Sequence, residues 1–194
     1  MLGFTLGWLS LEKVPFQSAR ALAEDPPARL TDVGPGARDL PSASGSAAST
    51  STVLMARRRI RELEQAAGRS PNDYGLLVQL GNASYDAEDW QRAVETYERA
   101  VKIKSDDANV LTDLGISHRN LGHIDRAIEL FDHAIRADPK HWPALFNLAI
   151  VYGLDKGDVS KANAILRTLK KEHPDVQSLD RLEKTLEAKG RNAR

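Results

Sequence analysis

The sequence predicts an all-α fold in which one pair of helices is repeated along the chain to form a solenoid. The first observation is a spacing of 34 residues, at which Leu80-Gly81 recurs as Leu114-Gly115. The second is that Ala93 recurs at the same spacing as Ala127. Self-similarity at a fixed period of this size indicates one supersecondary unit copied along the chain, so it decides the fold class before local propensities do.

The composition narrows the classes of function. The chain has 194 residues, and its 27 Lys and Arg balance its 27 Asp and Glu, so no net charge favours nucleic acid or anionic lipid. Aromatic residues make up only 6%, few for a protein that stacks on bases. The absence of cysteine excludes disulfides, thiolate catalysis and Cys-ligated zinc. We therefore expect no nucleic-acid partner and no bound cofactor.

Residues 1–11 are uncharged and mostly apolar, but no basic residue precedes them as in a secretory signal peptide. Three interpretations stay open: an interfacial or partner-binding segment, a membrane-anchor remnant if Met1 is not the true start, or a disordered apolar tail. The location of the protein stays equally open. It is cytoplasmic, or it is membrane-anchored and faces the periplasm if these residues end a truncated anchor.

Residues 12–52 are predicted to be a disordered linker. Five prolines interrupt helix formation in this stretch, and residues 41–52 (PSASGSAASTST) contain no large apolar side chain. Such a segment cannot bury enough surface to offset the loss of chain entropy. Order is expected to begin near Val53.

Residues 53–72 are predicted to be the second helix of a repeat whose first helix is missing. Val53, Ile60 and Leu63 lie on one helical face, with a run of charged residues mostly on the other. Gly68 favours a helix end, and Pro71 favours the start of the next unit. Prolines at 71, 139 and 174, with Ser105 between them, keep spacings of 34, 34 and 35 residues.

Three complete helix pairs follow in repeats 73–107, 108–141 and 142–175. The predicted helices cover residues 73–86 and 90–102, 108–121 and 124–137, and 142–154 and 159–172. The turns within the pairs carry residues that tight turns favour, such as Asp89, Gly122 and Gly157. We expect the extra residue of the third repeat to lie in its turn. A capping helix, residues 176–189, is apolar on one face and charged on the other, and residues 190–194 form a tail.

The recurring residues resemble the signature of the tetratricopeptide repeat family. Small residues recur where the two helices of a pair should cross, and an aromatic lies between the two alanines of the second helix. The matching residues are Leu80, Gly81, Ala93 and Tyr97, then Leu114, Gly115, Ala127, Phe131 and Pro139, then Leu148, Tyr152, Ala162 and Pro174. The resemblance covers roughly residues 53–189. It implies a right-handed superhelix of helical hairpins and a non-catalytic role in protein binding.

The resemblance also implies that the first helix of each pair lines a concave groove that accepts a peptide. The groove-facing candidates are Val78, Gln79, Asn82, Tyr85, Asn109, Thr112, Asp113, Ile116, Arg119, Asn120, Phe146, Asn147, Ile150 and Leu154. Among them Gln79, Asp113 and Asn147 form a ladder at the 34-residue spacing, and amides can pair with both backbone groups of an extended peptide. The alternative is that the polar row is solvated and the apolar row packs against neighbouring helices.

Some family members grip a C-terminal carboxylate with a clamp of Lys, Asn and Arg side chains. Only Asn82 fits that pattern here, while Val78, Asp113, Pro143 and Asn147 occupy the other places and none is cationic. A neutral or apolar ligand segment is therefore expected instead of an acidic chain end.

Neither a catalytic constellation nor a metal-binding motif is recognisable in the sequence. The histidines at 118, 123, 133, 141 and 173 do not show the i, i+4 spacing of a helical metal site. No phosphate-binding glycine loop or nucleophile elbow occurs either. We therefore expect a chain that is not an enzyme.

The function expected from the sequence is a scaffold that binds an extended peptide or a partner helix in the groove. One alternative is a membrane-tethered bacterial envelope assembly factor, similar to those of cytochrome c maturation. Another is the regulatory domain of a larger enzyme complex. Self-association stays open as well, because an incomplete first repeat leaves an end that a second subunit could cover.

Overall fold

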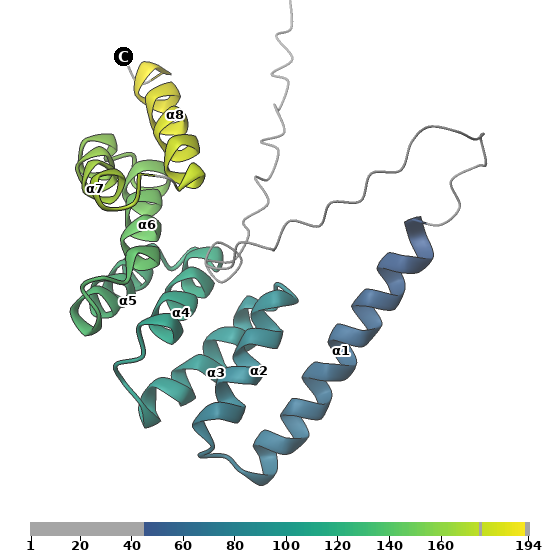
Figure 1. Ribbon diagram of the computed structural model, residues 1–194. Helices are drawn as coiled ribbons and strands as arrows, with labels where there is room; N and C mark the ends of the chain where they lie inside the picture. The colour runs from purple at the N-terminus through teal and green to yellow at the C-terminus, as the bar shows by residue number, and fades with distance from the viewer. Residues whose placement is uncertain (1–44, 175, 193–194) are drawn as a thin grey trace, which may run out of the picture. The chain divides into compact units, whose positions relative to one another are not determined.

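The computed structural model describes residues 45–174 and 176–192, with side chains from Val53 to Arg191, and this part of the chain is built from helices. The apolar segment 1–11, the linker up to residue 44 and residues 193–194 of the tail lie outside the described residues. The helices are α1 (Gly45–Arg69), α2 (Tyr74–Asp86), α3 (Trp90–Ile103), α4 (Ala108–Asn120), α5 (Ile124–Ala137), α6 (Trp142–Ile150), the π-helical turn η2 (Val151–Asp155), α7 (Val159–Glu172) and α8 (Gln177–Asn192) (Figure 1).

Neighbouring helices pack in the order in which they occur in the chain. Each of α1 to α7 contacts the next helix, and the first helices of successive pairs also touch, α2 with α4 and α4 with α6. The pairs α2–α3, α4–α5 and α6–α7 follow one another as stacked hairpins (Figure 1). This arrangement confirms the predicted all-α solenoid.

The two terminal helices are longer than the sequence predicted. Helix α1 begins at Gly45 instead of near Val53, and α8 ends at Asn192 instead of Lys189. After Pro41 the chain has no residue that forbids a helix, and adding residues to a formed helix is far easier than nucleating one. The 53–69 helix therefore extends backwards through the Ser, Ala and Thr run.

Helix α1 packs on α2 with one face and leaves the other to solvent. Ile60 and Ala67 are buried, while Arg59 and Glu62 are exposed. At the 34-residue spacing Arg59 and Glu62 correspond to Ala93 and Thr96, which are buried in α3. The side of α1 that would receive a first helix is therefore charged and solvated, as expected for half a repeat at the end of a stack.

The crossing of the two helices in a pair explains the recurring glycines. A Cβ added to Gly115 would lie 2.6 Å from Cε1 of Phe131, and Tyr97 occupies the same place over Gly81. Both aromatic rings are fully buried. At the corresponding positions the third pair has Ala149 and the smaller Leu166, both buried in one section of the core. At each crossing, the size of the residue on the first helix is therefore matched to the size of its counterpart on the second helix.

The turns within the three pairs have one length and one backbone shape. Each has three residues, with a left-handed residue in the middle: Gly122 at φ 81°, Gly157 at φ 73° and Glu88 at φ 56°. Glycine adopts this conformation without steric cost, whereas Glu88 has a Cβ that opposes it. The first pair therefore holds a strained residue where the other two hold glycine.

The extra residue of the third repeat lies inside a helix, so the prediction that it lies in the turn is wrong. The turn Lys156–Asp158 has the same three-residue length as the turn 121–123. The additional residue is instead absorbed by η2, the π-helical turn at the end of α6. Gly153 in this turn packs against Leu186 of α8 and Ala162 of α7, so the wider turn is held by tertiary contacts.

The apolar core forms two sections on opposite sides of α6. Ala144, Leu148 and Val151 belong to the section that α1 to α5 build, whereas Phe146, Ala149 and Ile150 pack with α7 and α8. Leu179, Leu182 and Leu186 of α8 are buried in the second section. None of the helices in the described part of the chain combines the length and apolar character needed to span a membrane.

Candidate functional site

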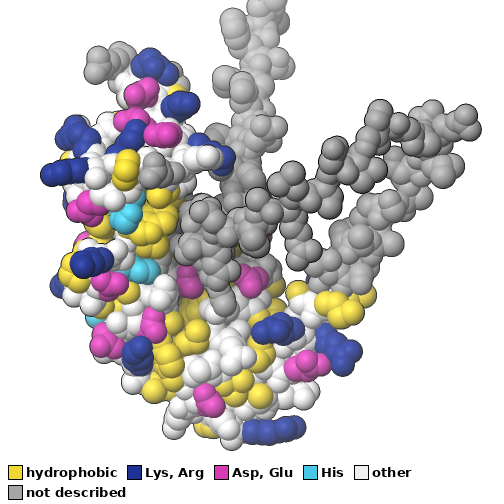
Figure 2. All heavy atoms as spheres, in the orientation of Figure 1, with side chains coloured by type: hydrophobic (Ala, Val, Ile, Leu, Met, Phe, Trp, Pro, Cys, Tyr) yellow, Lys and Arg dark blue, Asp and Glu magenta, His cyan; other side chains and the backbone are white. Residues whose placement is uncertain are grey.

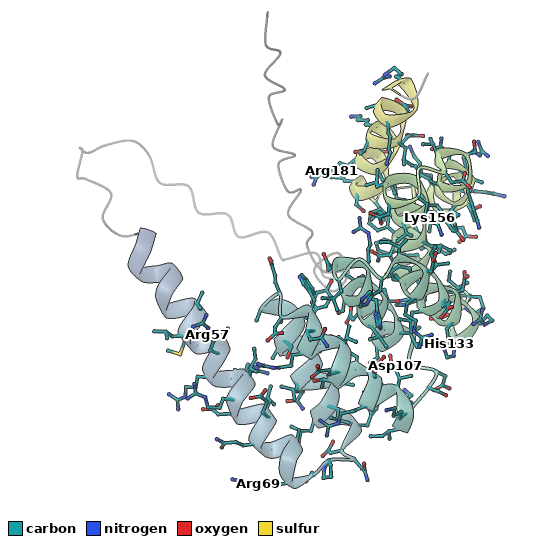
Figure 3. The ribbon with its side chains drawn as sticks, turned by 180° about the vertical axis from the view of Figure 1, so that it is seen from behind. Arg57, Arg69, Asp107, His133, Lys156 and Arg181 are labelled. Carbon is teal, nitrogen blue, oxygen red and sulfur yellow. The ribbon has the colours of Figure 1, made fainter. Side chains whose placement is uncertain are left out.

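The predicted groove residues belong to α2, α4 and α6, the helices that come first in each pair, except Leu154, which lies in η2 at the end of α6. Because α2 contacts α4 and α4 contacts α6, these three helices form one continuous face. Figure 2 shows hydrophobic side chains gathered in patches between charged side chains of both signs. Exposed charged side chains project from both terminal helices, such as Arg57 and Arg69 of α1 and Arg181 of α8 (Figure 3).

Exposure divides the predicted residues into three classes. Gln79, Asn109 and Asn120 are exposed, Val78, Asn82, Asp113, Arg119 and Leu154 are half-buried, and Tyr85, Thr112, Ile116, Phe146, Asn147 and Ile150 are buried. The face is therefore lined by side chains at different depths.

The buried members make their contacts inside the protein. Thr112 Oγ1 donates a hydrogen bond to the carbonyl of Ala108 at 2.7 Å and lies 3.0 Å from Nε2 of His141. The Phe146 ring packs edge-on against Trp142 with 6.1 Å between the ring centres. Ile116 has no exposed surface. The contacts of these residues are of the kind expected if the row packs inside the protein and does not face a ligand.

Two half-buried members already have partners within the protein. Oδ1 of Asn82 accepts a hydrogen bond of 2.8 Å from the Tyr97 hydroxyl. Arg119 forms two hydrogen bonds with the carboxylate of Asp155, Nε to Oδ2 at 2.5 Å and Nη2 to Oδ1 at 3.1 Å. The sequence offered no signal for Asp155, because it is η2 that places this residue opposite α4. The ion pair compensates the charge of Arg119 on this face.

The polar ladder changes steadily in depth along the face. Gln79 is exposed, Asp113 is half-buried and Asn147 is 1% exposed. Nδ2 of Asn147 donates to the carbonyl of Pro143 at 2.8 Å, but its Oδ1 is buried without a hydrogen-bond donor among the described residues. Leaving a buried acceptor unsatisfied costs about 1–3 kcal/mol. Asn147 therefore has an unused hydrogen-bonding capacity in the middle of the third pair.

The charges near Tyr85 give one end of the face an acidic character. Burial raises the pKa of the Tyr85 hydroxyl well above its usual value, and the carboxylates of Asp113 and Asp86 raise it further. The Tyr85 ring also packs edge-on against Trp90, with 5.2 Å between the ring centres. The phenol is therefore a neutral hydrogen-bond donor or acceptor throughout the physiological range.

Two of the five histidines meet, although their sequence spacing did not suggest a site. Nδ1 of His118, in the last turn of α4, lies 3.2 Å from Nδ1 of His123, which precedes α5. Burial lowers the pKa of His118, the nearby Glu98 carboxylate opposes this effect, and His123 and Arg126 reinforce it. Two residues that are five positions apart, on either side of a helix end, can meet in this way only if the turn folds back. Helical periodicity alone could therefore not reveal this contact. Within the described residues no group of three or more His, Asp and Glu side chains is arranged to hold a metal ion.

Two models of known protein families match the repeats of this chain. The pattern of the family described as "Tetratricopeptide repeat" matches residues 120–184, and that of "TPR repeat" matches residues 81–122. A search of curated proteins gives no match to this sequence.

Several solved structures resemble the fold. The crystal structure of MamA has a TM-score of 0.62 at 22% identity, covering 68% of this chain and 77% of that one. YrrB, described as a TPR protein with an unusual peptide-binding site, has a TM-score of 0.63 at 23% identity, covering 72% of each chain. The TPR domain of Arabidopsis OM64 has a TM-score of 0.56 at 21% identity, covering 59% of this chain and 94% of that domain. At these identities the likeness concerns the fold.

Proposed function

Because the chain belongs to the tetratricopeptide repeat family, we propose that it is a non-catalytic protein–protein interaction scaffold that holds an extended peptide or a partner helix along α2, α4 and α6. Repeats of this kind build long open faces, which suit a polypeptide ligand better than a small substrate. The proposal assigns binding to the face as a whole and catalysis to none of its residues.

The observation that carries the proposal is the unsatisfied Oδ1 of Asn147 within the polar ladder. This oxygen is buried and lacks a donor among the described residues, although the amide nitrogen is bonded. Because this oxygen is buried, the Asn147 side chain would have to turn outward before a backbone N–H of an extended peptide could donate to it. Gln79, two repeats away on the same face, offers both a donor and an acceptor at the surface.

Apolar side chains beside the ladder favour a ligand with apolar residues. Val78 is half-buried, and Tyr85 and Phe146 keep 7% and 8% of their surface exposed. A micromolar complex needs a binding free energy of about −8 kcal/mol, which a few such contacts with several backbone hydrogen bonds can supply. Because Asp86 and Asp113 lie near Tyr85, a neutral or basic peptide suits this end better than an acidic one. The likeness of the fold to YrrB, itself described as peptide-binding, supports this class of ligand.

The experiment is selection of peptides from a random displayed library on the full chain, followed by fluorescence anisotropy with the selected peptide. We expect Gln79→Ala and Asn109→Ala each to weaken binding about threefold to tenfold, because one hydrogen bond contributes about 0.5–1.5 kcal/mol. Both side chains are exposed, so the substitutions should not disturb the fold.

The matched control is Gln91→Ala, which removes an exposed amide from α3 instead of α2. It should leave the affinity unchanged. If Gln79→Ala, Asn109→Ala and Asn147→Ala all bind the selected peptide as tightly as the wild type, the face is not the binding site.

A further inference from the structure

The second repeat departs from the other two at two positions that meet in space. His118 stands where the first and third repeats have Ser84 and Tyr152. His123 stands where the other repeats have an aspartate that caps the following helix. Those aspartates, Asp89 and Asp158, accept the N–H of the third residue after them at 3.3 and 2.9 Å, whereas His123 makes no such bond. The second repeat therefore gives up a helix cap and gains a pair of facing imidazoles.

The distance between the two imidazoles suits a shared metal ion. Their Nδ1 atoms are 3.2 Å apart, with 5.4 Å between ring centres and 48° between ring planes. Two nitrogens bound to one ion at about 2.0–2.1 Å, with a tetrahedral angle between the bonds, lie about 3.3 Å apart. Little movement would therefore bring both nitrogens to one ion.

A carboxylate lies where a histidine ligand needs its outer partner. Nε2 of His118 is buried without a hydrogen-bond partner among the described residues, and Oε1 of Glu98 lies 3.9 Å from it. Ligation through Nδ1 leaves the proton on Nε2, which then faces Glu98 of α3. Carboxylates in this position fix the tautomer of a ligating histidine and make it a better ligand.

The charges and the exposure around the pair are compatible with a cation. Arg126 is a positive side chain near His118, and its guanidinium forms an ion pair of 2.7 Å with Glu129. His123 is exposed, so water can reach one side of the pair. No third protein ligand is arranged among the described residues, and the remaining coordination positions fall to water.

We propose that His118 and His123 form a binding site for a divalent ion of the late first transition row, such as Zn²⁺, Ni²⁺ or Cu²⁺, with Glu98 as the outer carboxylate. These ions prefer imidazole nitrogen, whereas Mg²⁺ and Ca²⁺ prefer oxygen ligands. The site lies at the turn between α4 and α5 and does not use the residues proposed to bind a peptide.

The test is isothermal titration of the full chain, free of any histidine tag and stripped with a chelator, with Zn²⁺ and then Ni²⁺. We expect one ion per chain and no heat with Mg²⁺. His123→Ser should abolish the binding, and because serine is a good cap the variant should fold as well as the wild type. Cu²⁺ bound to the wild type should show two coordinated nitrogens by electron paramagnetic resonance, and fewer in His123→Ser.

Two further variants complete the test. Glu98→Gln should weaken Zn²⁺ binding about tenfold or more, as loss of an outer carboxylate typically does. His133→Gln changes a histidine of α5 outside the pair and should leave the affinity unchanged. Absence of Zn²⁺ and Ni²⁺ binding up to millimolar concentration, or equal affinity of His123→Ser and the wild type, would overturn the proposal.

Discussion

The second and third helix pairs build the same hairpin with different residues. The pair α4–α5 uses Gly115 under Phe131, and its Ala134 is fully buried. The pair α6–α7 uses Ala149 with Leu166, and Leu169 replaces the second alanine. All of these residues are at most 2% exposed or lie in direct ring contact. The repeat therefore requires matched volume across each contact more than it requires particular residues.

The two pairs also differ in what packs on their second helix. Helix α5 is followed by α6, another first helix, whereas α7 is followed by the capping helix α8. The leucines of α8 fill this last junction together with Leu169. The π-helical turn η2, which the second pair lacks, contributes Gly153 to the same region. The third pair is thus adapted to its position at the end of the stack.

The substitution with the largest expected effect on stability is Leu169→Ala. It places in the third pair the alanine that the second pair has at the same position. Leu169 is fully buried among α7 and α8, so the substitution leaves a cavity that should destabilise the protein by about 2–5 kcal/mol. Urea unfolding followed by circular dichroism measures the loss. A change below 1 kcal/mol would show that alanine suits both junctions and that the volumes are not matched.

A second test exchanges the crossing residues of the second pair for those of the third. Gly115→Ala brings a methyl group into the Phe131 ring and should cost about 1–3 kcal/mol. The double variant Gly115→Ala with Phe131→Leu reproduces the combination of Ala149 and Leu166, and it should be more stable than the sum of the two single changes predicts. A double-mutant cycle from urea unfolding checks this, and strict additivity would contradict the matched crossing.

A substitution in the turn of the first pair should have a smaller effect, and it should stabilise the protein. Glu88→Gly places in the first pair the glycine that the second and third pairs have, and it removes a left-handed residue with a side chain. We expect a gain of about 1 kcal/mol, because such a backbone costs a non-glycine residue roughly 1–2 kcal/mol. Thermal unfolding should show a higher Tm. A lower Tm would mean that the Glu88 side chain stabilises the turn in some other way.

The smallest expected effect is a dependence on pH at the junction between the second and third pairs. Burial lowers the pKa of His141 below 6.5, partly offset by the charges of Asp138 and Asp107. The unfolded chain therefore binds the proton more tightly, so the contribution to stability is present above pH 6.5 and is lost as the pH falls towards the folded-state pKa. Free energies of unfolding at pH 7.5 and 5.5 should differ less in His141→Gln than in the wild type, and an equal difference would contradict this role.

Much of the fold was predictable because it is encoded in residues close together in the sequence. The spacing of Leu80-Gly81 and Leu114-Gly115 predicted the hairpins, and the glycines at 122 and 157 predicted their turns. The place of the extra residue in the third repeat was not predictable. Whether one residue enters a turn or widens a helix depends on contacts such as those of Gly153 with α7 and α8, which lie far apart in the sequence.

The candidate site was predictable only as a set of helices. The 34-residue repeat located α2, α4 and α6, and the family resemblance implied that these helices line the site. Neither could show that Gln79 stays exposed while Asn147, at the same position of its repeat, is buried. That difference depends on how closely neighbouring helices approach. The meeting of His118 and His123 was hidden for a related reason, since two residues on either side of a helix end come together only through the path of the turn.

Local sequence patterns were enough to predict the repeated hairpin, because periodic apolar residues, small crossing residues and turn glycines act within one repeat or between neighbouring repeats. The same patterns led us to expect a half repeat at one end and an amphipathic cap at the other. Tertiary structure alone decided the depth of each residue on the shared face, the π-helical turn, the ion pair of Arg119 with Asp155, and the contact of the two imidazoles. These depend on distances between helices, which result from the packing of all their side chains together and which no local pattern contains.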